Sequence, residues 1–189
     1  MDIMKRIPAV VLAVLAAGLP FAAGAFEVQS NLKRGQPIPP EYYHKMFGCT
    51  GSSQSPMLEW KSPPKGTKSF AITFFDTSAP TGSGFWHYVA YDIPPDVSRV
   101  EVGDLAAAKL PAGAKEGYTD LGKSGYFGPC PPVGRKHRYL YTIHALKTEK
   151  LDVPADASAA FVSFNLWLNT LGKASFEIVA GPRKAASPK

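Results

Sequence analysis

Apolar and polar residues alternate in several short segments bounded by Gly and Pro, a pattern typical of β-strands. The clearest segment covers residues 69–76 (SFAITFFD), where Phe70, Ile72 and Phe74 fall on one face of the predicted strand. The segments predicted as strands are residues 26–30, 57–60, 69–76, 87–93, 138–146 and 174–180.

A helical period appears between Pro154 and Gly172, where large apolar residues recur at spacings of three and four. Asp156 or Ser158 can cap the start of this predicted helix, and Gly172 can end it. The side chains expected to reach the core from this segment are Phe161, Phe164, Trp167, Leu168 and Leu171.

Residues 97–125 have weak periodicity, and we expect a long loop there with one short helix near residues 104–109. Many strands followed by one late helix predict a mainly β fold. The expected architecture is a sandwich or barrel core of antiparallel strands, with one C-terminal helix and short helical decorations.

The N-terminus has the pattern of a secretory signal peptide. Lys5 and Arg6 precede an apolar run over residues 7–19, and Ala23-Gly24-Ala25 provides a small-residue cleavage site. The apolar run is short for a membrane span, which needs about 20 residues, although an uncleaved anchor stays an alternative. We therefore predict a signal peptide over residues 1–25, a single domain over 26–182 and a frayed basic tail over 183–189. After cleavage the mature protein would be periplasmic or secreted. It would have no stable membrane span.

The chain has 189 residues, 45% of them hydrophobic, as expected for one globular domain. Its formal net charge of +6 is spread along the chain rather than clustered, and no aromatic-basic repeat accompanies it. This distribution argues against a nucleic-acid partner.

Two cysteines, Cys49 and Cys130, are the only ones in the chain. Export to an oxidising compartment favours a disulfide between them. Two reduced thiols are the alternative.

Three polar residues lie at the ends of predicted strands. Asp76 ends one strand, His87 opens the next, and His137 opens a third after a loop rich in Pro and Gly. Binding residues are often found in such positions. If the first two strands are neighbours, the three side chains can form one cluster, in which the carboxylate favours protonated imidazoles and hence an anionic ligand.

Five motifs in this order resemble the phosphatidylethanolamine-binding proteins, in the bacterial branch called Raf-kinase-inhibitor-like, over residues 48–171. The motifs are Gly48-Cys49-Thr50-Gly51 with Ser55-Pro56, Asp76-Thr77-Ser78-Ala79-Pro80, the segment 81–87 (TGSGFWH), Gly128–Gly134 with His137-Arg138-Tyr139, and the helical segment 161–169.

The resemblance implies a β-rich fold with an anion pocket formed by Asp76, His87, His137 and Tyr139, and with Pro132 at its rim. It also implies a cis peptide bond at Ala79-Pro80. The chain departs from the family at three positions. Thr77 and Ser78 stand where the family's D-P-D-A-P motif has Pro and a second Asp, and Ser53 stands where the family has a loop-ordering Asn.

We therefore expect an exported binding protein without a cofactor. Its ligand would be a phosphate ester, a phospholipid headgroup or a carboxylate, including a carboxylate on a partner protein. His87 and His137 would donate hydrogen bonds, and Asp76 would orient a histidine or accept from a protonated phosphate. The alternatives are an extracytoplasmic protein-interaction factor, a metal site of two histidines and Asp76, and a hydrolase that uses Ser83; we expect neither catalysis nor a metal. A homodimer stays open as a further partnership.

Overall fold

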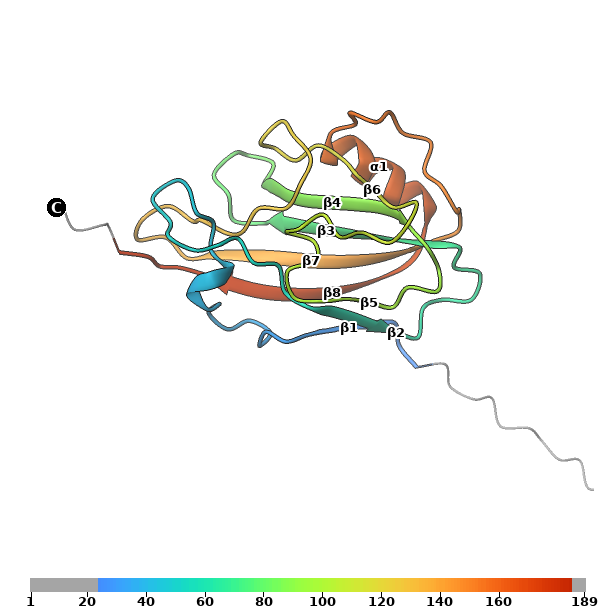
Figure 1. The fold of residues 1–189 in the computed structure, drawn as a ribbon, viewed down its shortest axis with the longest axis horizontal. Helices are drawn as coiled ribbons and strands as arrows, with labels where there is room; N and C mark the ends of the chain where they lie inside the picture. Colours follow the sequence, from blue (N-terminus) through green and yellow to red (C-terminus); the bar gives the residue numbers. More distant parts are fainter. Residues whose placement is uncertain (1–23, 185–189) are drawn as a thin grey trace, which may run out of the picture.

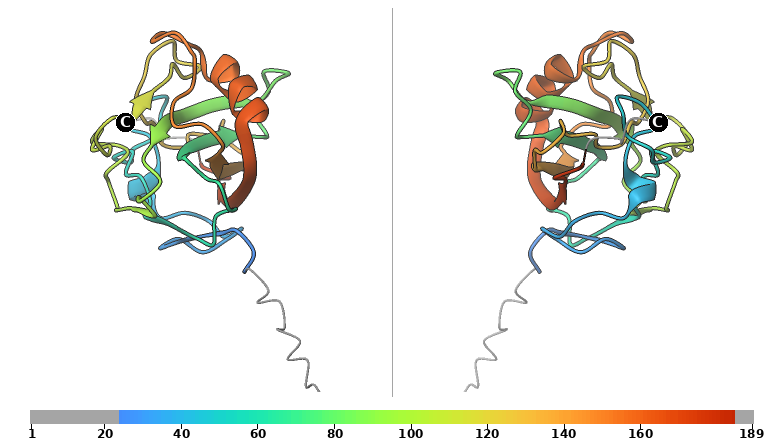
Figure 2. Two further views of the ribbon diagram at one scale, coloured as in Figure 1. Left: turned by 90° about the vertical axis from the view of Figure 1, so that its right-hand side faces the viewer. Right: turned by 90° about the vertical axis from the view of Figure 1, so that its left-hand side faces the viewer.

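The computed structural model describes residues 24–184, which form two antiparallel sheets with a helix on the outer face of the larger one (Figures 1 and 2). The small sheet has the order β1-β2-β5 and the large sheet the order β6-β4-β3-β7-β8. The strands are β1 (Glu27–Ser30), β2 (Leu58–Lys61), β3 (Ser69–Asp76), β4 (Phe85–Ile93), β5 (Arg99–Val100), β6 (Lys115–Glu116), β7 (His137–Leu146) and β8 (Thr170–Ala180). The helices are the 3₁₀ turn η1 (Pro40–Tyr42) and α1 (Ala159–Asn169).

The main core lies between the two sheets. Phe70, Ile72 and Phe74 of β3 all face it, as their alternation predicts, and they pack there with Trp60 of the small sheet and Tyr141 of β7. The opposite face of the large sheet contributes Ala71, Val89, Tyr91 and Leu146 to a second core under α1. Within residues 24–184 neither sheet closes on itself, so the molecule is a sandwich and not a barrel.

All six predicted strands are present, and the segment 69–76 has the predicted bounds. The β8 strand begins four residues earlier than predicted, so Gly172 lies inside a strand and does not end the helix. The prediction of a short helix near residues 104–109 is wrong. That segment is a series of turns held by bonds such as Ala107 N–H to the Gly103 carbonyl.

The helix α1 exists as predicted, and the Ser158 hydroxyl caps it by accepting from the Phe161 amide. The predicted buried face is wrong. Ala159, Val162 and Leu166 are buried, whereas Trp167 is 74% exposed. The other large apolar side chains exposed on and just after this helix are Phe161, Phe164, Leu168 and Leu171.

Close approach of α1 to the large sheet explains this reversal. A Cβ added at Gly117, beside β4, would lie 3.1 Å from a Val162 methyl carbon and 3.0 Å from one of Val89. The helix positions that face the sheet therefore accept small and medium side chains, and the larger aromatic residues of α1 face outward. The helix is apolar on both faces, so its periodicity does not distinguish them.

Substitutions on the two faces of α1 should have very different costs. Leu166→Ala should lower the free energy of unfolding by about 2 to 5 kcal/mol, because it leaves a cavity at a fully buried site. Trp167→Ala should change it by no more than about 0.5 kcal/mol. Urea unfolding of both variants measures these values, and a larger loss at Trp167 than at Leu166 would contradict the observed face.

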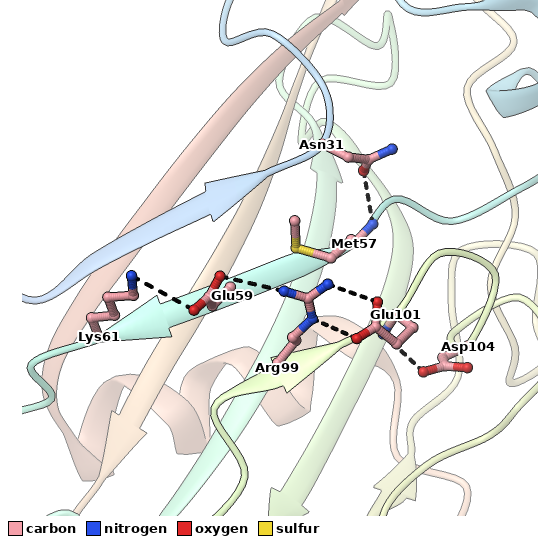
Figure 3. Close-up of polar contacts among 7 residues, drawn as sticks. All are labelled: Asn31, Met57, Glu59, Lys61, Arg99, Glu101 and Asp104. Atoms are coloured by element: carbon pink, nitrogen blue, oxygen red, sulfur yellow. Dashed lines mark hydrogen bonds and ion pairs between the residues drawn. The ribbon is translucent and has the colours of Figure 1, made fainter.

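Charged side chains connect the strands of the small sheet on its outer side (Figure 3). Arg99 of β5 pairs with Glu59 of β2 at 3.5 Å and also with Glu101, while Lys61 lies 3.6 Å from Glu59. These pairs are exposed, so each contributes little to stability. These ion pairs lie on the surface of the small sheet, whereas the candidate ligand site lies at one end of the large sheet.

The predicted signal peptide falls mostly outside the described residues, as do residues 185–189 of the predicted tail. Arg183, which we placed in the tail, is anchored: its guanidinium donates to the carbonyls of Phe47, Gly48 and Pro131. Among residues 24–184, no helix has the length and apolar character needed to cross a membrane.

Candidate ligand-binding site

The end of β3 and the starts of β4 and β7 meet at one end of the large sheet, on the left in Figure 1. Asp76 is the last residue of β3, and it pairs in register with Phe85 of β4 on one side and Tyr139 of β7 on the other. His87 and His137 each lie two residues from these partners, and side chains two residues apart share a face. Connectivity therefore brings the three predicted polar residues to the same end.

Asp76 and His137 form a buried pair. Nδ1–H of His137 donates to Oδ2 of Asp76 at 2.7 Å, and the two side chains are 7% and 5% exposed. The other carboxylate oxygen accepts from the Ser78 amide at 2.8 Å. Because both oxygens already have partners, Asp76 serves to orient the imidazole, and Nε2 of His137 is the ring nitrogen left for a ligand.

His87 is held by a different partner. Its Nδ1 lies 3.1 Å from the Phe127 carbonyl oxygen, which can only accept, so Nδ1 carries a proton. Burial lowers the pKa of His87 to about 3, although this hydrogen bond opposes the shift. The ring is therefore neutral, and its Nε2 is an acceptor. The expectation that His87 donates to an anion is corrected: in this state it accepts.

Tyr139 and Pro132 also line the site. Tyr139 is buried, and desolvation together with the neighbouring Asp76 raises the pKa of its phenol, which stays a neutral hydroxyl. Pro132 is exposed at the rim. The five residues predicted for the site thus surround one space.

That space is a cavity of about 340 Å³, a size suited to a small ligand. Polar groups at its base are surrounded by a mostly apolar wall. The wall residues include Phe47, Ala79, Pro80, Phe85, Leu121, Phe127 and Pro132. The cavity therefore suits a ligand with one polar end and an apolar body.

Two loops that are distant in sequence form one wall and are joined covalently. The disulfide Cys49–Cys130 is present, with the cysteines 81 residues apart, so the predicted pairing is confirmed. Gly128 explains how closely the loops approach, since a Cβ there would lie 2.2 Å from the Tyr42 carbonyl oxygen. The disulfide and the Arg183 guanidinium together hold Phe47 at the cavity.

Comparison with known proteins identifies the fold. The sequence model of the family described as phosphatidylethanolamine-binding protein matches residues 28–180. The chain belongs to this family.

Two Escherichia coli relatives of the family are similar along most of their length. The protein YbcL is 44% identical over 156 residues, which cover 80% of this chain and 85% of YbcL. The protein YbhB is 40% identical over 149 residues, which cover 78% of this chain and 94% of YbhB. The crystal structure of YbcL, a member of the mammalian PEBP family, superposes with a TM-score of 0.78 at 39% identity and covers 86% of this chain and 99% of that one.

The departures from the family's D-P-D-A-P motif have structural roles here. Thr77 donates through its amide and hydroxyl to the Arg138 carbonyl, and the Ser78 hydroxyl accepts from the Arg138 amide. Both residues therefore tie the turn after Asp76 to β7. The expected cis bond at Ala79-Pro80 is wrong, since the cis bond within residues 24–184 is Gly181-Pro182; the ties to β7 order this turn with a trans bond.

His44 is a residue of the site that the sequence did not reveal, because it lies in an irregular loop and no partner is evident from the sequence. It is buried, lines the cavity, and its Nδ1 lies 2.6 Å from the Ser53 hydroxyl. Ser53 also accepts from the Gly128 amide at 3.3 Å. Ser53 therefore orders this loop at the position where the family has Asn.

Acidification should destabilise the fold through His87. In an unfolded chain the imidazole of His87 takes up a proton near pH 6.5, but in the folded chain it does so only near pH 3. The unfolded state therefore binds more protons in between, so the contribution of neutral His87 is complete above pH 6.5 and declines as the pH falls. We expect His87 to account for a loss of about 2 kcal/mol between pH 7 and pH 5. Burial also lowers the pKa of His144 to about 4, so His144 adds a loss of similar size. Urea unfolding at both pH values measures the sum; His87→Gln should remove the share of His87, and an unchanged dependence would contradict the burial of a neutral ring.

Within the described residues, no set of three His, Cys, Asp or Glu side chains is arranged to hold a metal ion. The carboxylate of Asp76 is occupied by one histidine and one amide. Besides the ring of His44, the polar part of the cavity lining thus presents Nε2 of His137 and Nε2 of His87 to a ligand.

Proposed function

We propose that this protein is an exported binding protein whose cavity takes a phosphate monoester in its singly protonated form. The observation that carries the proposal is the buried Asp76–His137 pair at the base of a cavity with a mostly apolar wall. The wall has one exposed carboxylate, that of Asp120, which accepts from the Trp86 amide at 2.8 Å. With both ring nitrogens of His137 protonated, Nδ1–H keeps its bond to Asp76 and Nε2–H donates to a phosphate oxygen in a charge-assisted hydrogen bond.

Neutral His87 supplies the complementary partner. Its Nε2 accepts, so it fits the P–O–H group of a singly protonated phosphate. A carboxylate has acceptor oxygens only and would leave this nitrogen unpaired. The pair of histidines therefore favours a phosphate ester over a carboxylate, and the apolar wall favours an ester that carries an apolar substituent.

Calorimetric titration with methyl phosphate, phenyl phosphate and acetate at pH 5.5 and pH 8 tests this proposal. Both esters should bind, phenyl phosphate more tightly than methyl phosphate, and both less tightly at pH 8, where the phosphate with its second pKa near 6 has lost its proton. Equal affinity for acetate and methyl phosphate would refute the role of His87. No binding at millimolar concentrations would refute the proposal as a whole.

Binding without turnover is the second part of the proposal. Ser83, the nucleophile that a hydrolase would need, is not among the residues that line the cavity, and neither is another serine. Incubation with phenyl phosphate should release no phenol above the buffer rate. Release that Ser83→Ala abolishes would contradict this part.

Export is supported by the signal-peptide pattern and by the disulfide, which forms in oxidising compartments. Cleavage after Ala25 would leave the whole of β1 in the mature chain. N-terminal sequencing of the protein from a periplasmic fraction or culture medium should therefore begin at Phe26. An uncleaved N-terminus in the membrane fraction would contradict this expectation.

A further inference from the structure

A second cavity adjoins the first and has the opposite character. Its volume is about 470 Å³, and it shares His44, Phe47, Leu121 and Phe127 with the first cavity. The two spaces therefore lie on either side of a common wall. The two cavities are therefore neighbours, separated by these four side chains.

The second cavity carries positive charge without a compensating carboxylate. Lys45 and Lys123 line it together with several hydroxyl groups, and no Asp or Glu does so. Among residues 24–184 neither ammonium group has a carboxylate within 4.0 Å. Both lysines lie close enough to His44 to lower the pKa of its imidazole, after the larger effect of burial.

His44 lines both cavities and has a polar atom without a hydrogen-bond partner. Its side chain is only 7% exposed, and its buried Nε2 has no hydrogen-bond partner. The Ser53 hydroxyl accepts from the Gly128 amide, so its own proton is available to Nδ1 of His44. With Nδ1 as the acceptor, the neutral ring carries its proton on Nε2 and presents a donor without an acceptor, an arrangement that an anion would relieve.

The backbone around the two lysines is fixed before any ligand arrives. The amide and hydroxyl of Thr119 both donate to the Lys123 carbonyl, at 2.9 and 2.8 Å. On the other side of the cavity, the His44 amide donates to the Pro129 carbonyl at 2.9 Å, and Cys49 follows in the same loop with its disulfide. A prearranged site loses less free energy on binding than one that must order its loops.

We propose that the second cavity is an anion subsite, and that the ligand of this protein is a soluble small molecule with two anionic groups. The first group lies against His137 and His87, which rests on the function proposed above, and the second lies between Lys45 and Lys123. Nε2–H of His44 donates to this second group. The backbone of Phe47 stays bonded to Arg183, and only its exposed ring, whose centroid is 5.7 Å from the imidazole, rotates to admit the group. The spacer between the two groups passes the apolar side chains of Phe127 and Leu121.

Calorimetric titration with methylphosphonate and with alkane-α,ω-bisphosphonates of increasing spacer length tests the proposal. The bisphosphonate of matching length should bind at least about 10-fold more tightly than methylphosphonate, because its second group binds at a high effective concentration. The double variant Lys45→Ala/Lys123→Ala should lose this advantage and keep its affinity for methylphosphonate within about 2-fold. The matched control Lys147→Ala/Lys173→Ala removes the same charge at exposed positions that line neither cavity, and it should keep the advantage.

The possible results separate the two proposals. An equal affinity for methylphosphonate and every bisphosphonate overturns the subsite, as does an advantage that survives in the Lys45→Ala/Lys123→Ala variant. If methylphosphonate does not bind at all, the function proposed above fails. The subsite is then decided by the imidazole NMR signal of His44, which should move with the bisphosphonate in the wild type and not in the lysine double variant.

Discussion

Replacement of both cysteines by alanine is expected to lower the free energy of unfolding by about 4 to 5 kcal/mol. The disulfide Cys49–Cys130 closes a loop of 81 residues, and a cross-link over such a length removes much conformational entropy from the unfolded chain. A loss of this size is a large fraction of the stability of an average domain, about 5 to 15 kcal/mol.

Urea unfolding of the double variant and of the wild type, each with and without reductant, measures this effect. Reductant should destabilise the wild type to a similar extent and leave the double variant unchanged, which separates loss of the bridge from loss of side-chain packing. A difference below about 1 kcal/mol would contradict the expected role of the bridge. Because the bridge holds Phe47 at the cavity, the variant should also bind phosphate esters more weakly.

The variant His137→Gln is expected to weaken the binding of phenyl phosphate by about 10- to 100-fold. It removes a hydrogen bond from a charged donor to the anion, and such bonds contribute about 1.5 to 3 kcal/mol. The Asp76 carboxylate would also be left buried without its histidine partner. Calorimetric titration at pH 5.5 measures the change, and thermal unfolding shows that the variant is folded.

A matched control is available on the other face of the same strand. His144 also lies in β7, but it does not line the cavity and its Nδ1 pairs with the Thr170 hydroxyl at 3.3 Å. The variant His144→Gln should keep the wild-type affinity within about 2-fold. An equal loss in both variants would show that the effect comes from the stability of β7 and not from the ligand site.

Much of the large sheet could be predicted from the sequence, because its strands are rich in aromatic and β-branched residues and are bounded by turn-forming residues. The strand that ends at Asp76 has the predicted bounds, and the residues before it face the core as their alternation indicates. The candidate site followed from the same reasoning. Asp76, His87 and His137 lie at strand ends, and antiparallel neighbours bring these ends together.

The features that could not be predicted from the sequence depend on tertiary contacts. The buried face of α1 depends on how closely the helix approaches β4, and this distance is absent from the helical period. His44 could not be recognised as a site residue. Its partner Ser53 is nine residues away, and no local sequence pattern predicts how the loop brings the two side chains together. The protonation of His87 depends on its burial and on the Phe127 carbonyl, which is 40 residues away in sequence.

The central claim is that a phosphate ester binds at the imidazoles of His137 and His87. Two-dimensional NMR of the imidazole groups during a titration with phenyl phosphate at pH 5.5 tests it most directly. The signals of His137 and His87 should move and saturate together, while those of His144 stay in place. Unmoved signals of His137 and His87 at millimolar phenyl phosphate would contradict the claim.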